Sequence, residues 1–249
     1  MEIHFLLFLA GLVGGTMNAL AGGGSGITFA ALVFTGMPPI VANATNTFAA
    51  TFGYITGVIG YRKHMQGYWS DLIWQMPLAF VGGLIGGRAL LQTDPQLFAA
   101  AVPWLLLLAT LLFMAGPQLE RAAAQLGRKR IKAIGAFAIF LTCIYGGYFQ
   151  GGFGILTLAA LSLGGYTAVR AMNGMKLLFA TVSSLAAIFL FAAEGKIDWL
   201  GGLAALLGIG IGSYGAARLT DYVSDVSVKR ASLAVCWLVT AYAFYSTCD

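Results

Sequence analysis

The sequence predicts an all-α polytopic membrane protein with two homologous halves arranged as inverted repeats. Hydrophobic residues make up 59% of the 249 residues and charged residues only 9%. Soluble domains carry about a quarter charged residues, so most of this surface must face lipid. The apolar residues fall in segments that are long enough to span a bilayer. The pattern of glycines, polar residues and charges in the first half also returns in the second.

Eight apolar segments follow one another along the chain, joined by short polar turns. Six have the length of one membrane-spanning helix, since about 20 residues cross a hydrocarbon core about 30 Å thick. The other two hold 34 residues each, which is too long for one span and too short for two. The segments are residues 3–36, 41–61, 70–91, 97–116, 131–164, 171–193, 197–217 and 228–246.

Glycines interrupt each long segment near its middle, at residues 21–26 and at residues 146–154. We expect two short helices that meet at a break inside the membrane, because glycine weakens a helix. Unwound backbone survives in a bilayer only where it lines a cavity or is buried in protein. The two breaks therefore predict a functional site. The alternative is that these glycines serve only close helix packing.

An internal repeat aligns the two halves at a shift of about 128 residues. Residues 24–27 match residues 152–155, and further on residues 44–46 resemble residues 171–173. The predicted organisation is a first transmembrane repeat over residues 1–116, a basic cytoplasmic linker over residues 117–130, and a second transmembrane repeat over residues 131–249.

The positions of the basic residues predict the topology. The linker is rich in arginine and lysine, and such loops stay in the cytoplasm. If each broken segment enters and leaves on one side, most other basic residues are cytoplasmic too. That arrangement gives each half a Gly-broken helix hairpin plus three transmembrane helices, so the halves are inverted, as in many transporters. The alternative is eight plain spans.

The acidic residues are predicted to lie in loops or at helix ends. Asp71 and Asp198 correspond between the halves and are predicted to be matched N-caps. Without a carboxylate in mid-span, a side-chain proton relay has no candidate, and no cofactor or metal is expected. The net charge of +5 lies in short loops and does not indicate a nucleic-acid partner.

The predicted site gathers glycine N–H groups, amides and hydroxyls around the two breaks. An apolar helix begins just after each break, and the free N–H groups of a helix N-terminus attract an anion. Amide side chains donate hydrogen bonds without adding charge, although bonding between helices is an alternative role for them. The predicted substrate-binding residues are Asn18, Gly22, Gly23, Gly24, Ser25, Gly26, Asn43, Thr45, Asn46, Gln150, Gly151, Gly152, Gly154, Asn173 and Lys176.

Lys176 is a cation inside the apolar run over residues 175–179. A charged residue within a membrane span is a candidate functional residue. The alternative is that its side chain extends to the cytoplasmic interface, because the start of its helix is near. Together with the glycines and amides, this lysine favours a small anion as the partner.

The sequence around the first break also resembles a known family. Residues 14–28, the turn at residues 36–39 and residues 42–47 are similar, in this order, to the TauE/SafE sulfite exporter family. The second glycine motif with residues 173–178 looks like the second half of that family. The resemblance covers nearly the whole chain. Thr47 departs from it, because many members have a lysine at that position.

This resemblance implies a secondary transporter, an exporter, in the bacterial inner membrane. The substrates that it implies are small sulfur-containing anions: sulfite, thiosulfate or organosulfonates such as sulfoacetate. An anion channel and an importer of another small oxyanion are the open alternatives. An enzyme is disfavoured, because no nucleophile–base pair or metal-ligand cluster is present in the sequence. The expected partners are the anion and the lipid bilayer, and a homodimer is left open.

Overall fold

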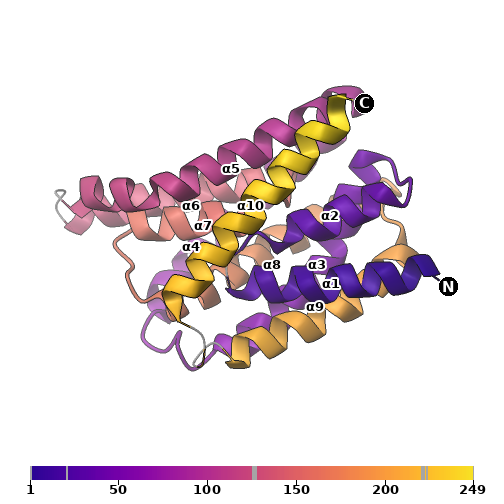
Figure 1. Cartoon of the computed structure of the whole chain (residues 1–249). Coiled ribbons are helices and arrows are strands. Elements are labelled where there is room, and N and C mark those ends of the chain that lie inside the picture. Colours follow the sequence, from indigo (N-terminus) through magenta and orange to yellow (C-terminus); the bar gives the residue numbers. More distant parts are fainter. Residues whose placement is uncertain (1, 21, 125–127, 220–221, 223, 249) are drawn as a thin grey trace.

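The computed structural model describes residues 2–20, 22–124, 128–219, 222 and 224–248. These residues form ten helices and no strand (Figure 1). In chain order the helices are α1 (Glu2–Leu20), α2 (Gly24–Phe34), α3 (Pro39–Tyr61), α4 (Trp69–Leu91), α5 (Pro95–Ala124), α6 (Arg128–Tyr148), α7 (Phe153–Leu163), α8 (Val169–Ala193), α9 (Trp199–Leu219) and α10 (Asp225–Cys248).

Five stretches are apolar and long enough to cross a membrane. They are the whole of α1, α8 and α9, together with Pro95–Leu112 of α5 and Ile131–Tyr148 of α6. The prediction of an all-helical, multi-pass membrane protein agrees with this architecture.

The two glycine-broken segments form the helix pairs α1–α2 and α6–α7. The second helix of each pair has 11 residues, or about 16 Å, which is too short to cross a bilayer. α7 folds back along α6, because Gly146 contacts Phe153 beside the break while Gly135 contacts Gly164 at the far end. α2 packs against α1 in the same way. The broken hairpins are therefore present, and eight plain spans do not fit.

The chain ends lie on one side of the bundle, as Figure 1 shows. The C-terminal end of α5 and the N-terminal end of α6 lie on the opposite side. This path agrees with two hairpins that each return to the side they came from. The predicted linker over residues 117–130 is shorter than expected, because α5 continues to Ala124 and α6 begins at Arg128. Residues 125–127 of that linker lie outside the described residues.

Small residues allow the closest helix contacts. α1 packs on α9 at Gly15, where an added Cβ would overlap the Ile209 carbonyl. α4 packs on α6 at Gly86, where an added Cβ would overlap the Ile144 carbonyl. In a membrane, such close backbone packing holds helices together, because lipid tails are as apolar as the side chains.

The packing partners in the first five helices recur in the second five. α1 packs on α9 and α3, and α6 packs on α4 and α8. α3 contacts α9 as α8 contacts α4, and α2 contacts α10 as α7 contacts α5. Replacing each helix by the one five places further on leaves these pairings unchanged. The α3–α8 and α5–α10 pairs are their own counterparts under this replacement, and the two sets of helices also meet at the α1–α9 and α4–α6 pairs.

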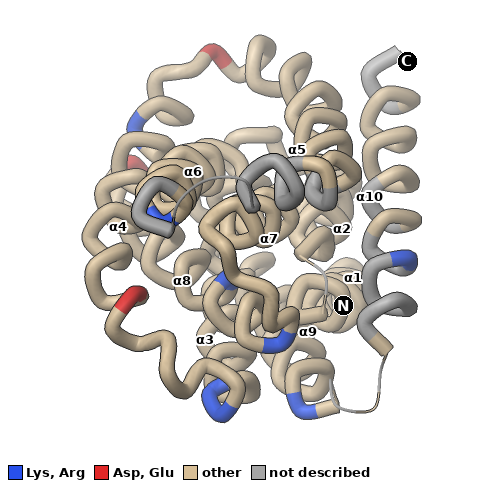
Figure 2. Tube along the Cα trace, turned by 90° about the vertical axis from the view of Figure 1, so that its left-hand side faces the viewer, with Lys and Arg blue, Asp and Glu red and all other residues tan. Residues whose placement is uncertain are grey.

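Charged residues gather at the turns and helix ends (Figure 2). Asp198 caps α9 as predicted, since its Oδ1 accepts two first-turn N–H groups at 3.1 and 3.2 Å. The prediction for Asp71 is wrong, because α4 begins before it and its carboxylate instead pairs with Lys132 at 3.0 Å. The Tyr166 hydroxyl donates to the same carboxylate at 3.2 Å. Burial raises the pKa of Tyr166 to about 12, and the charge of Asp71 adds to this rise.

Candidate functional site

The two glycine breaks meet each other backbone to backbone. Gly22 lies in the first break with a φ of +97°, and Gly154 lies in the first turn of α7. A Cβ on Gly22 would lie 2.6 Å from the carbonyl carbon of Gly154, and a Cβ on Gly154 would lie 2.7 Å from the Cα of Gly22. No side chain fits between them. The structure therefore brings together the glycines that the sequence placed in separate halves.

Both short helices begin at a glycine N-cap. Gly23 caps α2, and Gly152 caps α7 with a φ of +81°, a left-handed conformation that favours glycine. Residues 24–26 form the first turn of α2 and Gly154 that of α7, so these residues are helical and border the breaks. Neither N-cap supplies a side chain to the first-turn N–H groups. Two of these N–H groups bond back to the caps, that of Gly26 to the Gly23 carbonyl at 3.2 Å and that of Ile155 to the Gly152 carbonyl at 3.0 Å. An N–H group at a helix N-terminus that is left without such a bond can bind an anion.

Asn46 on α3 holds the first break. Its Nδ2 donates to the Ser25 carbonyl at 3.0 Å, and its Oδ1 accepts from the Thr28 hydroxyl at 2.5 Å. The Ser25 hydroxyl in turn donates to the Gln150 carbonyl at 2.7 Å. All four side chains are buried. This chain of bonds fixes the first turn of α2 and ties it to the second break.

Asn43, one turn earlier on α3, holds the second break at two points. Its Nδ2 donates to the Tyr148 carbonyl at 3.1 Å, and its Oδ1 accepts from the Gln150 N–H at 3.2 Å. The Gln150 Nε2 donates to the Ser184 hydroxyl on α8 at 2.6 Å. Its Oε1 is buried and has no hydrogen-bond partner among the described residues. The break thus holds one amide group whose hydrogen-bonding capacity is unfilled, which is uncommon for a buried polar atom.

Lys176 holds the first break from α8. Its side chain is fully buried, and Nζ donates to the carbonyls of Asn18 at 2.9 Å and Ala19 at 3.3 Å. It also donates to Oδ1 of Asn173 at 2.8 Å. The ammonium therefore lies at the C-terminal end of α1, where the helix dipole favours a cation. The alternative of a side chain that reaches the interface does not hold.

Lys176 is the one buried charge among the residues that the structure describes. The ion pairs found in that part of the chain, Arg88 with Glu194 and Lys132 with Asp71, involve partly exposed side chains elsewhere. A buried charge is costly unless it is paired. The carbonyls solvate this ammonium but leave its charge uncompensated, so a bound anion would complete the pair.

Thr45 is not brought to either break. Its hydroxyl accepts a hydrogen bond from the backbone N–H of Asp198 at 3.0 Å, and it therefore faces the turn before α9. Gly151 does lie at the second break, where its carbonyl accepts from the Tyr145 hydroxyl at 2.6 Å. Asn173 is linked to the first break through Lys176, which donates to its Oδ1.

Two tyrosines belong to the site although the sequence did not single them out. Tyr145 on α6 binds the second break, and Tyr54 on α3 is buried beside the side chains of Asn18 and Ser25. Tyr54 lies 11 residues after Asn43, which is three helical turns further along the same face. That spacing could have indicated Tyr54, whereas nothing in the sequence indicates Tyr145.

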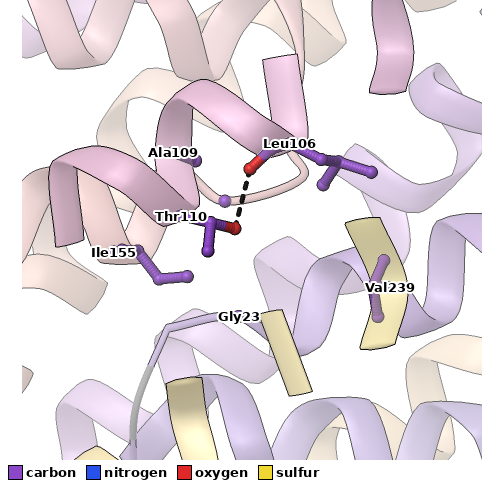
Figure 3. A pocket seen from close by; sticks show the side chains of 7 residues that line it. Gly23, Leu106, Ala109, Thr110, Ile155 and Val239 are labelled. Atoms are coloured by element: carbon purple, nitrogen blue, oxygen red, sulfur yellow. Dashed lines mark hydrogen bonds between the residues drawn. The ribbon is translucent and has the colours of Figure 1, made fainter. Parts of the chain in front are cut away.

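A small cavity lies beside both breaks (Figure 3). Its volume is about 10 Å³, which is room for about one water molecule. On the side of α5 and α10, the Thr110 and Thr240 hydroxyls lie 3.2 Å apart. This cavity has no room for a larger solute. The lining residues are Gly23, Leu106, Ala109, Thr110, Gly152, Ile155 and Val239.

Known proteins match the chain across both breaks. The family model described as "Sulfite exporter TauE/SafE" matches residues 7–243. A probable membrane transporter protein of Haemophilus influenzae is 28% identical over 252 residues, covering 98% of this chain and 95% of that protein. The probable membrane transporter protein YfcA of Escherichia coli K12 is 29% identical over 247 residues, covering 97% of this chain and 90% of that protein. No solved structure matches the chain.

Proposed function

The chain belongs to the TauE/SafE sulfite exporter family, and on this premise we propose that it exports small sulfur-containing anions, such as sulfite or organosulfonates, across the bacterial inner membrane. The comparisons establish that the chain belongs to a family of membrane transporters. The substrate, the direction of transport and the membrane are what we propose. One observation carries the choice of an anion: two glycine breaks meet beside a buried lysine that has no carboxylate partner in the described chain.

The chemistry around the breaks is rich in hydrogen-bond donors. The first-turn N–H groups of α2 and α7 have no capping side chain, and they point from the positive ends of two helix dipoles. Lys176 adds a fully buried basic side chain, whose ammonium form would be stabilised by a bound anion. A sulfite or sulfonate group has several oxygens that accept hydrogen bonds and carries negative charge, so it complements this set of donors.

We propose that the halves over residues 1–116 and 131–249 are inverted repeats that alternate access to a site between them. Two features support this. The helix pairings are preserved when each helix is replaced by its counterpart five places on. The chain ends and the α5–α6 connection lie on opposite sides of the bundle. In transporters of this plan, one repeat rocks against the other around a central site formed by broken helices.

Efflux from proteoliposomes tests the proposal. Vesicles that contain the purified protein are loaded with ³⁵S-labelled sulfite or sulfoacetate, and the release of label is followed over time. We expect saturable efflux that falls at least about tenfold in Lys176→Met, in line with the loss of a buried charged partner. Lys132→Met removes a partly exposed lysine that pairs with Asp71, and it serves as the matched control with efflux unchanged.

Three results would overturn the proposal. If neither labelled anion leaves the vesicles, the substrate class is wrong. If the flux does not saturate and appears as single-channel current, the protein is an anion channel. If Lys176→Met and Lys132→Met behave alike, the buried lysine does not serve the anion.

A further inference from the structure

A second, much larger cavity lies between α2, α5 and α10. Its volume is about 450 Å³, which is within the range of pockets that hold small organic ligands. The lining is apolar apart from Gln96 and Tyr242, and none of its described residues carries a charge. It includes Phe29 and Val33 of α2 and Pro103 of α5. The ends of α2 and α10 that reach it lie on the side of the chain termini (Figure 1).

The inner end of this outer cavity reaches the glycine breaks. Leu106 and Val239 line both the outer cavity and the small cavity at the breaks. A Cβ on Gly26 would lie 3.1 Å from Cγ1 of Val239 and 3.7 Å from Cδ2 of Leu106. A Cβ on Gly151 would lie 3.2 Å from the same Leu106 atom. Leu106 therefore lies against both breaks, and with Val239 it separates them from the outer cavity.

From this continuity we infer that the outer cavity binds the apolar group of an organosulfonate whose sulfonate faces the breaks. Leu106 and Val239 form the barrier that opens when the substrate passes between the breaks and the outer cavity. The inference rests on the proposed function and narrows its substrate class to sulfonates with an alkyl or aryl group. A sulfonate carries one negative charge, which matches the single buried ammonium of Lys176.

The lining of the outer cavity favours such a molecule over inorganic sulfite. Sulfite would exchange its water shell for uncharged, mostly apolar walls and gain little in return. An alkyl group gains free energy for each methylene that leaves water. A membrane protein can also hold a lipid acyl chain in an apolar cavity, but an acyl chain has no need of a connection to the breaks.

A chain-length series tests the inference. Efflux of labelled methanesulfonate from proteoliposomes is competed with n-alkanesulfonates of one to six carbons. In the unchanged protein we expect each added methylene to lower the half-inhibitory concentration about threefold to fourfold, the factor for burial of one CH₂ group. Ala100→Phe places a ring among the residues that line the outer cavity and is expected to abolish this gradient, measured relative to methanesulfonate in the same variant. Ala30→Phe, on the α2 wall, tests the same cavity independently.

The matched control is Ala10→Phe. Ala10 lines a different apolar groove, on α1, that does not include Leu106 or Val239. This variant adds the same ring at another apolar groove and should keep the full gradient, which shows that an added ring alone does not remove it.

Each outcome separates the inference from the proposed function. Transport of sulfite or methanesulfonate without a chain-length gradient overturns the inference and leaves the proposed function standing. A gradient that persists in both filled variants also overturns it, because the longer sulfonates then gain affinity outside the outer cavity. Absence of any sulfur-anion transport overturns the proposed function itself.

Discussion

The two glycine breaks share a backbone plan but are held by different chemistry. At the first break, Lys176 of α8 donates to the carbonyls of Asn18 and Ala19. At the second, Asn43 of α3 accepts from one backbone group and donates to another. Each break is thus contacted by a side chain from the other half, and the first is also held by Asn46 of its own half. The glycines determine where the helices end, while the facing side chain determines whether the break carries charge.

The difference indicates which break attracts an anion. A neutral amide satisfies backbone groups without burying a charge, as Asn43 shows at the second break. A buried ammonium can also satisfy backbone carbonyls, but at a higher desolvation cost. If holding the chain were the whole purpose, an amide would serve at both breaks. The lysine therefore points to an anionic partner at the first break.

The largest effect is expected where the two breaks touch. Gly22→Ala forces a left-handed residue to carry a Cβ, which costs about 1–2 kcal/mol. The same Cβ would lie 2.6 Å from the Gly154 carbonyl carbon, which adds about 1–3 kcal/mol of overpacking. We expect a clear fall of the thermal midpoint in detergent and loss of efflux.

Gly36→Ala is the matched control for Gly22→Ala. Gly36 has a φ of +87°, but an added Cβ there meets nothing within 4 Å. This variant should show only the conformational cost of about 1–2 kcal/mol and keep its efflux. Equal losses in the two variants would mean that contact between the breaks contributes nothing.

The next effect separates charge from hydrogen bonding. Lys176→Met and Asn43→Leu each leave backbone groups of one break without a partner, at a cost of about 1–3 kcal/mol per buried group. Lys176→Met also removes a basic side chain, whereas Asn43→Leu removes a neutral one. We expect similar losses of thermal stability, but at least about a tenfold greater loss of efflux in Lys176→Met. Efflux that simply follows stability in both variants would show that the charge has no special role.

A smaller effect is expected for the link between the breaks. Ser25→Ala removes the hydrogen bond from its hydroxyl to the Gln150 carbonyl, which is 2.7 Å long. One such bond contributes about 1 kcal/mol. Thermal unfolding in detergent should show this loss. The Thr45 hydroxyl faces the α8–α9 turn and not the breaks. Thr45→Val should therefore leave the affinity for sulfite unchanged. A fall in affinity for Thr45→Val would place that residue in the site after all.

The smallest effect is expected for Thr110→Val. The Thr110 hydroxyl already donates to the Leu106 carbonyl of its own helix, at 2.9 Å, and approaches Thr240 at 3.2 Å. Hydrogen bonds between transmembrane helices average about 0.6 kcal/mol. Stability should therefore change by less than about 1 kcal/mol, as measured by unfolding in detergent. A large loss would mean that the α5–α10 contact holds the bundle closed.

Much of the fold could be predicted from the sequence, because glycine and hydrophobic length act locally. The 34-residue segments could form neither one span nor two, and the structure contains the expected broken pairs. The same reasoning located Asn46, Gln150 and Lys176 beside the breaks, since polar groups in a membrane need partners. The internal repeat further suggested that the two breaks would come together.

The remaining features depend on contacts between distant segments. Asp71 matches Asp198 in sequence, yet Lys132 and Tyr166 lie close enough to bind its carboxylate. Thr45 shares its motif with Asn46, but one residue along a helix turns its hydroxyl toward α9. The outer cavity is formed by three helices that are far apart in sequence, so no local pattern could reveal it.

The most direct test of the paired breaks is an anomalous diffraction experiment on crystals soaked with selenite, a heavier analogue of sulfite. One selenium peak is expected between residues 22–26 and residues 151–154. Its oxygens should lie about 3 Å from first-turn N–H groups, at hydrogen-bond distance. A peak elsewhere in the bundle, with both breaks still closed on each other, would contradict it.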